Sequence, residues 1–418
     1  MNVWLVNPFD PLPGDPEQEG RYATLARLLV GRGHEVTWWT SAFSHRFKRP
    51  VDQAAIVAAC EPIGLNVLFL SAPPYQKNVS LARMRNHRVL ARQFAQIAPS
   101  ERPSPDIVVA SAPPPLLARE AVRFAHGLGV QAIVDVQDLW PETFRRVAPG
   151  PFRPLADLCL RPSARVSRQA YAEADAIVGV AEAYVERAIT LGGPKRLAET
   201  IPLGIDLAAF DKAAGAGRAA RFTKPPGEVW LIYAGSLNRS YDCLTILHAA
   251  ARLKERLKTP WRIFMTSRGE LRTEAERLIQ HGGLGNVTLT GFLDFPTWAY
   301  LLSQCDAGFN TALPEALIFL PNKIFYYLAA GAAVLNTIPG QCSRIVREGG
   351  CGLDYEAGNA ESCADAVERL VGRPEARAAM GAAARRLAET VYDRRVLYPR
   401  YAEMIEGVGR DGGDTGRP

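Results

Sequence analysis

Short runs of Val, Ile and Leu recur through both halves of the chain, bounded by turn residues and separated by amphipathic stretches. A parallel sheet is buried on both faces, so its strands are continuously apolar and each crossover needs a helix. The pattern therefore predicts an α/β protein. The predicted strands cover residues 3–6, 35–39, 66–70, 106–111, 131–136 and 176–180, then 229–235, 261–267, 286–291, 307–310 and 332–336.

The strand pattern restarts at Val229, and 418 residues exceed the size at which one core keeps growing. We therefore expect two Rossmann-like domains, at residues 1–206 and 229–388. Segment 207–228 is rich in Ala, Gly and basic residues, ends in Pro-Pro-Gly and is predicted to be a linker. We expect a helix at 389–406 to complete the first domain and 407–418 to form a flexible tail.

Composition excludes several classes of protein. The 48% of apolar and 22% of charged residues are typical of a soluble globular protein. Seven widely spaced cysteines without a CxxC pair predict neither disulfides nor a zinc site. The first residues lack the features of a signal peptide, so a cytoplasmic location is expected. Segment 316–335 is nearly uncharged but has Pro-Asn-Lys at its centre, which favours a loop, a short helix and a strand over a membrane span.

The net charge of +6 is modest, but basic clusters at 45–49, 83–88 and 145–147 all lie in the first half. This asymmetry is compatible with an anionic partner, such as a membrane surface, a lipid phosphate or a nucleic acid. Solvated arginines scattered over the surface are the alternative interpretation. Segments 44–49 and 75–88 are the expected places of membrane contact.

The most informative segment for ligand binding is PNKIFYYLAAGAAVLNTIPG, residues 321–340. Asn322 is predicted to cap a helix of about two turns that begins at Lys323 and ends at Gly331. The helix dipole disfavours a cation at this amino terminus, and a bound diphosphate would resolve the conflict. We expect Lys323 and Tyr326 to share one face of the helix, with Ile324 turned to the core. A surface lysine on a short buried helix is the alternative.

Neither half contains GxGxxG after its first strand, and no P-loop is present, so a dinucleotide cofactor is not expected. PNKIFYYLAAG, together with YAGSLNRSYD (233–242), DVQDLWPE (135–142) and EGRYATLARLLVGRGHEV (19–36), resembles family 4 of the retaining glycosyltransferases. The resemblance is strongest to the branch that builds bacterial surface polysaccharides.

This resemblance implies the GT-B architecture, in which two Rossmann-like domains face each other across a cleft. It implies a UDP-, dTDP- or GDP-sugar donor bound mainly by the second domain, and a glycan or polyprenyl-diphosphate-linked acceptor bound mainly by the first. Transfer would retain the anomeric configuration and would need no cofactor or metal. The protein would lie in the cytoplasm, with peripheral contact to the inner face of the membrane, and would bind no nucleic acid.

The resemblance also assigns residues. Lys323 and Arg239 would neutralise the diphosphate, and Asp138 would hold a sugar hydroxyl or, alternatively, cap the following turn. The positions expected to bind the donor are Gly20, Arg21, Gly235, Asn238, Gly291, Phe292, Leu293, Glu315, Asn322 and Tyr326. Of these, Gly291 to Leu293 would line the nucleobase.

The sequence departs from the family pattern at three positions. An arginine and a lysine of the loop that follows the first strand of the second domain are replaced by Ser236 and Tyr241. The glutamate that normally holds the ribose is replaced by Tyr326, which predicts either a donor with an altered nucleotide, such as a deoxyribonucleotide, or weakened catalysis. Two rival functions follow: another reaction class on this fold, such as a nucleotide-sugar epimerase, and a non-catalytic scaffold.

Overall fold

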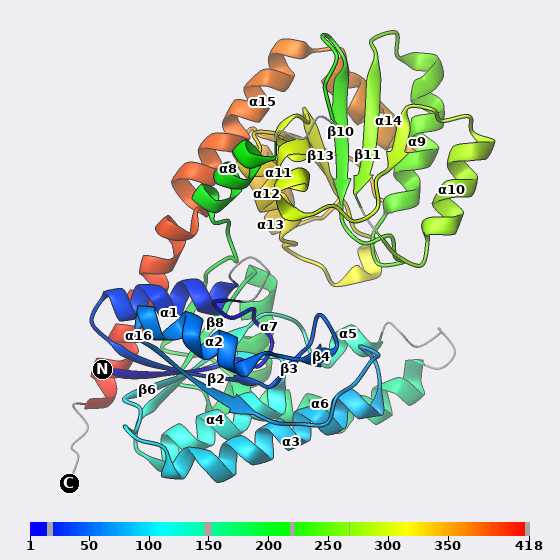
Figure 1. Cartoon of the computed structure of the whole chain (residues 1–418). Helices are drawn as coiled ribbons and strands as arrows, with labels where there is room; N and C mark the ends of the chain where they lie inside the picture. The colour runs from blue at the N-terminus through cyan, green and yellow to red at the C-terminus, as the bar shows by residue number, and fades with distance from the viewer. Residues whose placement is uncertain (15–19, 146–152, 218–221, 267, 414–418) are drawn as a thin grey trace. The chain divides into compact units, whose positions relative to one another are not determined.

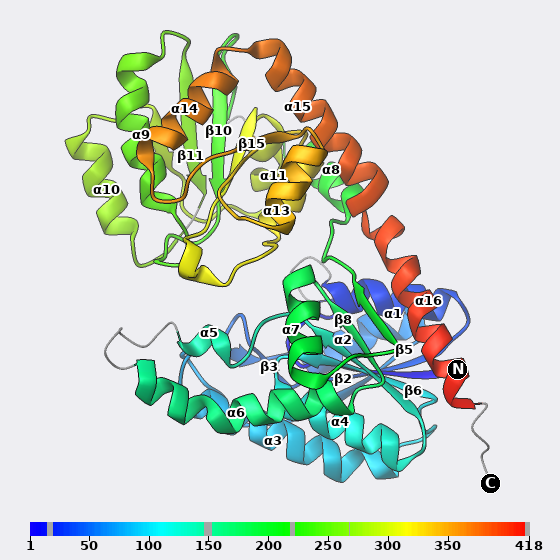
Figure 2. The same ribbon diagram turned by 180° about the vertical axis from the view of Figure 1, so that it is seen from behind.

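The computed structural model describes residues 1–14, 20–145, 153–217, 222–266 and 268–413. Its contacts divide the chain into two compact units. The first unit combines residues 1–202 with the helix from Leu397 onward, and the second comprises residues 203–396. Each unit is built around one parallel sheet with helices on both faces (Figure 1; Figure 2).

Within the described residues, the first unit has a seven-stranded parallel sheet in the order β5-β2-β1-β6-β7-β8-β9. Its strands are β1 (Asn2–Val6), β2 (Glu35–Ser41), β5 (Leu65–Leu70), β6 (Ile107–Ala112), β7 (Gln131–Val136), β8 (Ala176–Gly179) and β9 (Leu197–Thr200), beside a small hairpin of β3 (Phe43–Ser44) and β4 (Arg49–Pro50). Its helices are α1 (Arg21–Gly31), α2 (Gln53–Cys60), α3 (Leu81–Ile97), α4 (Pro115–Gly127), α5 (Glu142–Arg145), α6 (Arg153–Glu173) and α7 (Glu182–Gly192), with short turns at Glu61–Ile63 and Ala98–Ser100.

Aromatic side chains fill the core on the face of this sheet that α3, α4 and α6 cover (Figure 1). Trp4 of β1 lies 5.1 Å from Trp39 of β2 and 5.3 Å from Phe124 of α4, measured between ring centroids. Phe94 of α3 packs edge-on against Trp39 at 5.0 Å. These large rings join the first two strands to two helices in one apolar layer.

The second unit has, among the described residues, a six-stranded parallel sheet in the order β12-β11-β10-β13-β14-β15. Its strands are β10 (Val229–Ala234), β11 (Trp261–Thr266), β12 (Val287–Leu289), β13 (Ala307–Asn310), β14 (Ala333–Asn336) and β15 (Gly352–Asp354). Its helices are α8 (Leu207–Ala216), α9 (Cys243–Arg256), α10 (Arg272–His281), α11 (Phe295–Ser303), α12 (Lys323–Ala329), α13 (Gln341–Glu348), α14 (Ala360–Val371) and α15 (Pro374–Leu387), with short turns at Pro314–Ala316 and Ala388–Tyr392.

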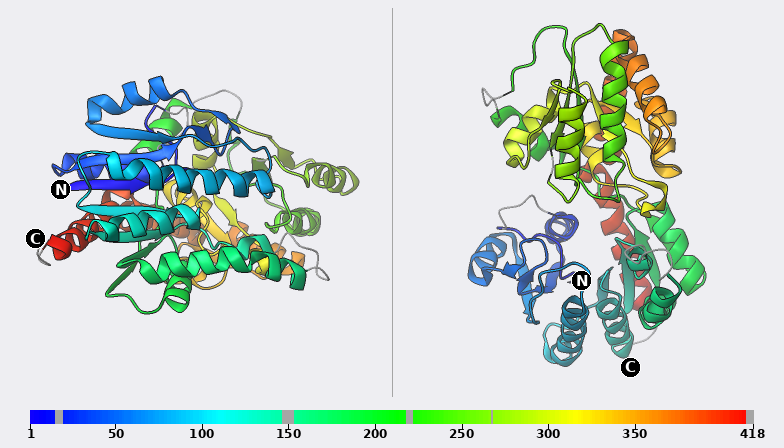
Figure 3. Two further views of the ribbon diagram at one scale, coloured as in Figure 1. Left: turned by 90° about the horizontal axis from the view of Figure 1, so that it is seen from below. Right: turned by 90° about the vertical axis from the view of Figure 1, so that its right-hand side faces the viewer.

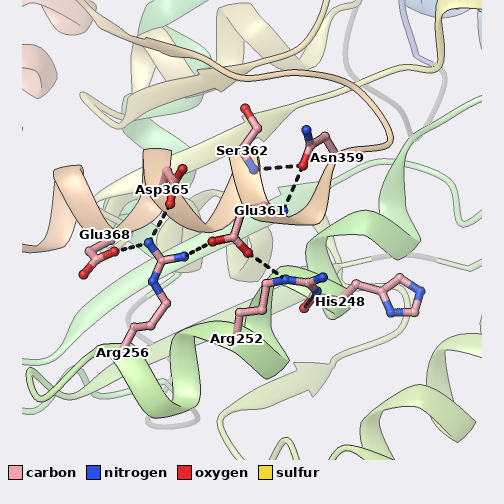
Figure 4. Close-up of polar contacts among 8 residues, drawn as sticks. All are labelled: His248, Arg252, Arg256, Asn359, Glu361, Ser362, Asp365 and Glu368. Carbon is pink, nitrogen blue, oxygen red and sulfur yellow. Dashed lines mark hydrogen bonds and ion pairs between the residues drawn. The ribbon is translucent and has the colours of Figure 1, made fainter.

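Helices α9 and α14 lie side by side on one face of the second sheet and are joined by an ion-pair network (Figure 2; Figure 4). Arg256 of α9 contacts three acidic side chains of α14: Glu361 at 2.9 Å, Asp365 at 2.5 Å and Glu368 at 2.5 Å. These pairs are partly exposed to solvent, so each contributes little stability. They connect the two helices at the surface, while apolar residues pack them against the sheet.

The predicted α/β class is confirmed, and each of the eleven predicted strands is present within one or two residues of its expected bounds. The sequence missed the outer strands β9 and β15 and the small hairpin of β3 and β4. Strands β9 and β15 are only partly buried and carry polar residues, so they lack the continuous apolar run that identifies a central strand. No helix in the described ranges is long and apolar enough to span a bilayer.

Two boundaries differ from those expected. The segment predicted as a linker begins with helix α8, which Asp206 caps by accepting a hydrogen bond from Ala209 N at 2.9 Å, and it belongs to the second unit. The helix expected at 389–406 is instead α16 (Arg394–Gly413), so the predicted tail is helical as far as Gly413, and 414–418 lie outside the described residues. Glu406 of α16 accepts hydrogen bonds from Arg32 at 2.7 Å and from His34 at 2.9 Å, which ties α16 to the first unit.

Candidate functional site

Both sheets reverse their strand order beside their first strand, between β1 and β6 in the first unit and between β10 and β13 in the second. In open α/β sheets, ligands bind beyond the carboxyl ends of the strands at this point. Each unit therefore has one favoured position for a ligand, and the predicted site residues can be compared with it.

Lys323 lies at this position in the second unit. Its ammonium group donates a hydrogen bond to the carbonyl of Thr311, just after β13, at 3.0 Å. It also lies over the rings of Tyr233, at 4.8 Å, and Tyr241, at 4.2 Å. A methyl group added at Gly235, just after β10, would lie 3.4 Å from Lys323 Nζ. The fold thus brings together Lys323 and Gly235, which were predicted, with two tyrosines and a carbonyl that were not predicted as ligand-binding groups.

The Lys323 side chain is buried, which contradicts the alternative interpretation of this residue as a surface lysine. Only 8% of the residue is exposed, and burial lowers the pKa of its ammonium group to about 7. Among the described residues, no carboxylate forms an ion pair with it. A buried cation without a carboxylate is unfavourable unless another anion binds beside it. The position, the missing counter-ion and the adjacent glycine together favour binding of an anionic ligand.

Tyr327 holds α12 in the position that buries Lys323. Its hydroxyl accepts a hydrogen bond from Ala234 N at 3.0 Å and donates one to Phe309 O at 3.1 Å, so it connects the ends of β10 and β13. Its ring fits only because residue 308 is glycine, since a Cβ there would lie 2.3 Å from the ring. Ile324, which was predicted to turn to the core, is fully buried, and so is Tyr327.

In the loop after β10, a polar side chain forms a hydrogen bond within the loop itself. Asn238 Oδ1 accepts a hydrogen bond from Ser240 N at 2.9 Å, which closes a turn within the loop. The side chain of Arg239 is 84% exposed, and its Nε lies 3.9 Å from Glu270 Oε1. Arg239 therefore extends into solvent, and a role in binding a diphosphate stays a prediction for both Arg239 and Asn238.

Three predictions around α12 need correction or remain open. Asn322 precedes the helix but has a helical backbone, with φ −54° and ψ −29°, and its side chain makes no capping hydrogen bond. A capping residue needs an extended backbone for that bond, so the predicted cap is wrong. Tyr326 does not share the surroundings of Lys323, because its ring packs 4.9 Å from Trp298 of α11. Glu315 lies exposed in the turn at Pro314–Ala316, and its contact with a ribose stays a prediction.

The loop after β12 carries the residues expected to line a nucleobase. Gly291 adopts φ 72°, a left-handed conformation that glycine accepts without strain. The ring of Phe292 is 64% exposed, and the guanidinium of Arg268 lies 5.5 Å from its centroid. An exposed aromatic ring can stack on a base, so this role remains a prediction for Gly291, Phe292 and Leu293.

The residues at the amino terminus of α1 make close contacts within the first unit. A Cβ at Gly20 would lie 2.9 Å from Pro11, so the protein's own loop already requires a glycine there. The Arg21 side chain is fully buried and donates to Asp135 Oδ2 at 2.9 Å and to Asp135 Oδ1 at 3.2 Å. Burial alone would lower the pKa of Arg21, but the Asp135 carboxylate raises it. The charge of the Arg21 side chain is therefore used inside the first unit, and donor binding at Gly20 and Arg21 stays a prediction.

Asp138 borders a pocket of about 360 Å³ at the favoured position of the first unit. Its Oδ1 accepts a hydrogen bond from Leu139 N at 2.8 Å, and its Oδ2 accepts one from Trp140 Nε1 at 3.1 Å, which is the turn-capping role foreseen as the alternative. Burial raises the pKa of Asp138, and these hydrogen bonds oppose the rise. The residues lining this pocket are Phe9, His45, Asn78, Val79, Arg83, Pro113, Gln137, Asp138, Trp140, Thr143 and Phe144.

The sequence did not single out the other polar groups of this pocket. His45 lies on the loop after β3, and its Nδ1 is 2.5 Å from the Tyr75 hydroxyl. Burial and the charges of Arg83 and Lys48 lower the pKa of His45 to about 3, so the imidazole is neutral. The sequence pointed to these pocket residues only through the basic and aromatic residues grouped in segments 44–49 and 75–88, which were predicted to contact a membrane.

Comparison with known proteins agrees with this geometry. Residues 20–204 match the model of the glycosyl transferase 4-like domain, and residues 228–373 match that of the glycosyl transferases group 1. Sucrose-phosphate synthase from Thermosynechococcus elongatus is 15% identical, with 98% of this chain and 100% of that chain covered and a TM-score of 0.70. Anabaena HepE in complex with UDP is 14% identical, with 97% and 99% covered and a TM-score of 0.68.

WaaG, a glycosyltransferase involved in lipopolysaccharide biosynthesis, is 15% identical over 97% of this chain and 100% of its own, with a TM-score of 0.62. At these identities the likeness is one of fold. No curated protein matches the sequence significantly. The matched family models cover most of both units, and the structural neighbours share the GT-B fold. The chain therefore belongs to the GT-B glycosyltransferases, with a glycosyl transferase 4-like domain followed by a group 1 domain.

Proposed function

We propose that this protein transfers a sugar, with retention of configuration, from a nucleotide sugar to a glycan or lipid-linked acceptor in bacterial surface polysaccharide synthesis. The observation that carries the proposal is the buried Lys323 ammonium beside Gly235, without a carboxylate partner among the described residues. Structures of the related HepE with UDP and UDP-glucose, and the role of WaaG in lipopolysaccharide biosynthesis, support it.

In the proposed reaction, the bond between the anomeric carbon and the diphosphate oxygen breaks, and its electron pair stays on the leaving nucleoside diphosphate. The acceptor hydroxyl oxygen bonds to the anomeric carbon on the same face, and its proton passes to the departing phosphate oxygen. Negative charge on the diphosphate grows during bond cleavage. A preorganised ammonium group in a dry site stabilises that growing charge, and Lys323 supplies one.

Donor binding should depend on pH because of Lys323. Its ammonium has a pKa of about 7 in the free protein, and a bound diphosphate would raise this pKa. Binding therefore takes up a proton above pH 7, and affinity should fall as pH rises from 7 to 8.5, by up to about tenfold per unit. Calorimetry with UDP-glucose in two buffers of different ionisation enthalpy measures this uptake. Lys323→Met should abolish it, whereas equal heats in both buffers for the unaltered protein would contradict the assignment.

Turnover with a panel of UDP-, dTDP- and GDP-sugars and a lipid-linked acceptor tests the function itself. NMR of the product distinguishes retention from inversion. Binding of a donor without turnover would favour the scaffold function, and epimerised free sugar would favour an epimerase. The same panel decides whether Tyr326, in place of the ribose-binding glutamate, favours a dTDP-sugar.

We also infer peripheral contact with the inner face of the membrane through segments 44–49 and 75–88. Arg46, Arg49 and Arg85 are exposed, whereas Tyr75 is only 2% exposed and cannot contribute its ring. Each exposed cation adds about 1 kcal/mol near an anionic surface, so binding should be reversible and weakened by salt. Sedimentation with vesicles containing anionic lipid measures this, with neutral vesicles as the control. Binding that needs no anionic lipid would contradict it.

A further inference from the structure

An apolar groove of about 600 Å³ adjoins the Asp138 pocket in the first unit. Helices α3 and α6 form its walls and the start of α4 forms its floor, because α4 lies between the other two and both extend past its first turn (Figure 1; Figure 3). The groove is lined by Asn78, Val79, Ser80, Leu81, Arg83, Met84, His87, Arg88, Pro114, Pro115, Leu116, Trp140, Phe144, Cys159, Leu160, Pro162, Ser163 and Val166. This lining contains two arginines and no carboxylate.

Arg83 lies at the junction, since it lines both the groove and the pocket. It is 8% exposed, its Nη1 donates to Asn78 O at 2.8 Å, and its guanidinium lies 4.5 Å from the centroid of the Trp140 ring. Among the described residues, its buried Nε has no hydrogen-bond partner, and no carboxylate forms an ion pair with it. His87 Nε2, which is also buried, has no partner either. A desolvated cation therefore lies at the point where the two cavities meet, and within the described part of the chain its charge is balanced only by the Asp138 carboxylate, which acts on it without an ion pair.

Apolar side chains surround the outer end of the groove. Leu81 is 83% exposed, Val79 50% and Met84 44%, and all three line it. On α6, Leu155 and Leu158 are 58% and 54% exposed, close in sequence to the lining residues Cys159 and Leu160. Exposed apolar groups concentrated at one opening mark a surface that contacts lipid or another apolar partner.

We propose that these two cavities bind the two ends of one amphiphilic acceptor, with a phosphate or diphosphate held by Arg83, the sugar beside Asp138 and the hydrocarbon chain along the α3–α6 groove. The proposal rests on the proposed function and specifies its acceptor. The absence of carboxylates from the groove lining and the positive charge of Arg83 at the junction favour an anionic head group over a neutral one. The exposed leucines would let the hydrocarbon chain pass from the groove into a bilayer.

Binding of soluble probes tests the site without turnover. The probes are geranylgeranyl diphosphate below its micellar concentration, the uncharged geranylgeraniol, and inorganic diphosphate. Arg83→Gln should weaken geranylgeranyl diphosphate about ten- to hundredfold, the range for a hydrogen bond to a charged group, and should leave geranylgeraniol unchanged. Val166→Trp should fill the groove and weaken both prenyl probes about tenfold or more, as displacement of two buried methylene groups would.

Matched controls are Arg92→Gln, on the exposed side of α3, and Val57→Trp on α2, neither of which lines the groove. Both should keep wild-type affinity for all probes.

The proposal fails if the unaltered protein binds geranylgeranyl diphosphate no better than inorganic diphosphate, or if Arg83→Gln leaves the affinity for geranylgeranyl diphosphate unchanged. Should Arg83→Gln not fold, the preference of the unaltered protein for the charged over the uncharged prenyl probe still tests anion recognition. UDP-glucose binding, measured alongside, reports on the second unit, so failure of donor binding is distinguished from failure of the acceptor site.

Discussion

Replacing Lys323 with methionine is expected to lower the rate of sugar transfer about a hundredfold or more while leaving the protein folded. The ammonium group should interact most strongly with the leaving diphosphate as its charge grows, and loss of one such group typically costs a factor of 10² to 10³ in rate. Methionine has a similar length and no charge, so it fills the space between Tyr233 and Tyr241 without the cost of burying a cation. The free energy of unfolding should therefore stay the same or rise.

Steady-state turnover and chemical denaturation of the same preparation separate the two effects. Alanine is a poorer replacement than methionine for this test, because at this buried position it leaves a cavity. Lys212→Met, at an exposed position on α8, is the matched control and should change neither activity nor stability. Near-normal turnover of Lys323→Met would remove this residue from the catalytic site.

Asp135→Ala is expected to destabilise the first unit by about 3–5 kcal/mol, because it leaves the fully buried guanidinium of Arg21 without its counter-ion. The same guanidinium lies 4.7 Å from the ring of Tyr401 and 5.6 Å from that of Tyr398, both on α16. Loss of the ion pair should therefore also loosen the contact of α16 with the first unit. Urea denaturation followed by circular dichroism measures the loss, and hydrogen exchange in α16 locates it.

The exposed pair of Arg123 and Glu173 provides the control. Their side chains are 45% and 32% exposed, so Glu173→Ala should cost no more than about 1 kcal/mol. Replacing both members of the buried pair, as Arg21→Met with Asp135→Leu, should recover most of the stability lost in Asp135→Ala. An Asp135→Ala variant as stable as Glu173→Ala would show that the buried pair does not stabilise the unit.

The sequence determined the central strands and the class of fold, because these depend on local patterns. A strand buried on both faces must be apolar along its length, so β6 and β10 could be located from their own residues. The outer strand β15 could not, since its three residues are only partly buried and pair with β14 from one side. The alanine-rich start of the predicted linker forms α8 because Asp206 caps it and Phe210 is buried in the second unit.

Only the tertiary structure decided which charged residues are available for chemistry. Arg21, Arg83 and Lys323 are all basic residues near the start of a helix; the sequence assigned Arg21 and Lys323 to donor binding and placed Arg83 in a segment expected to contact a membrane. All three are buried, but Arg21 meets a carboxylate 114 residues away, whereas Lys323 and Arg83 have no carboxylate partner among the described residues. The partner of a buried charge is set by contacts between distant segments, which no local pattern encodes. The sequence could therefore name Lys323 and Gly235, but only the fold shows that Arg21 is paired within the first unit and that Arg83 faces a cavity.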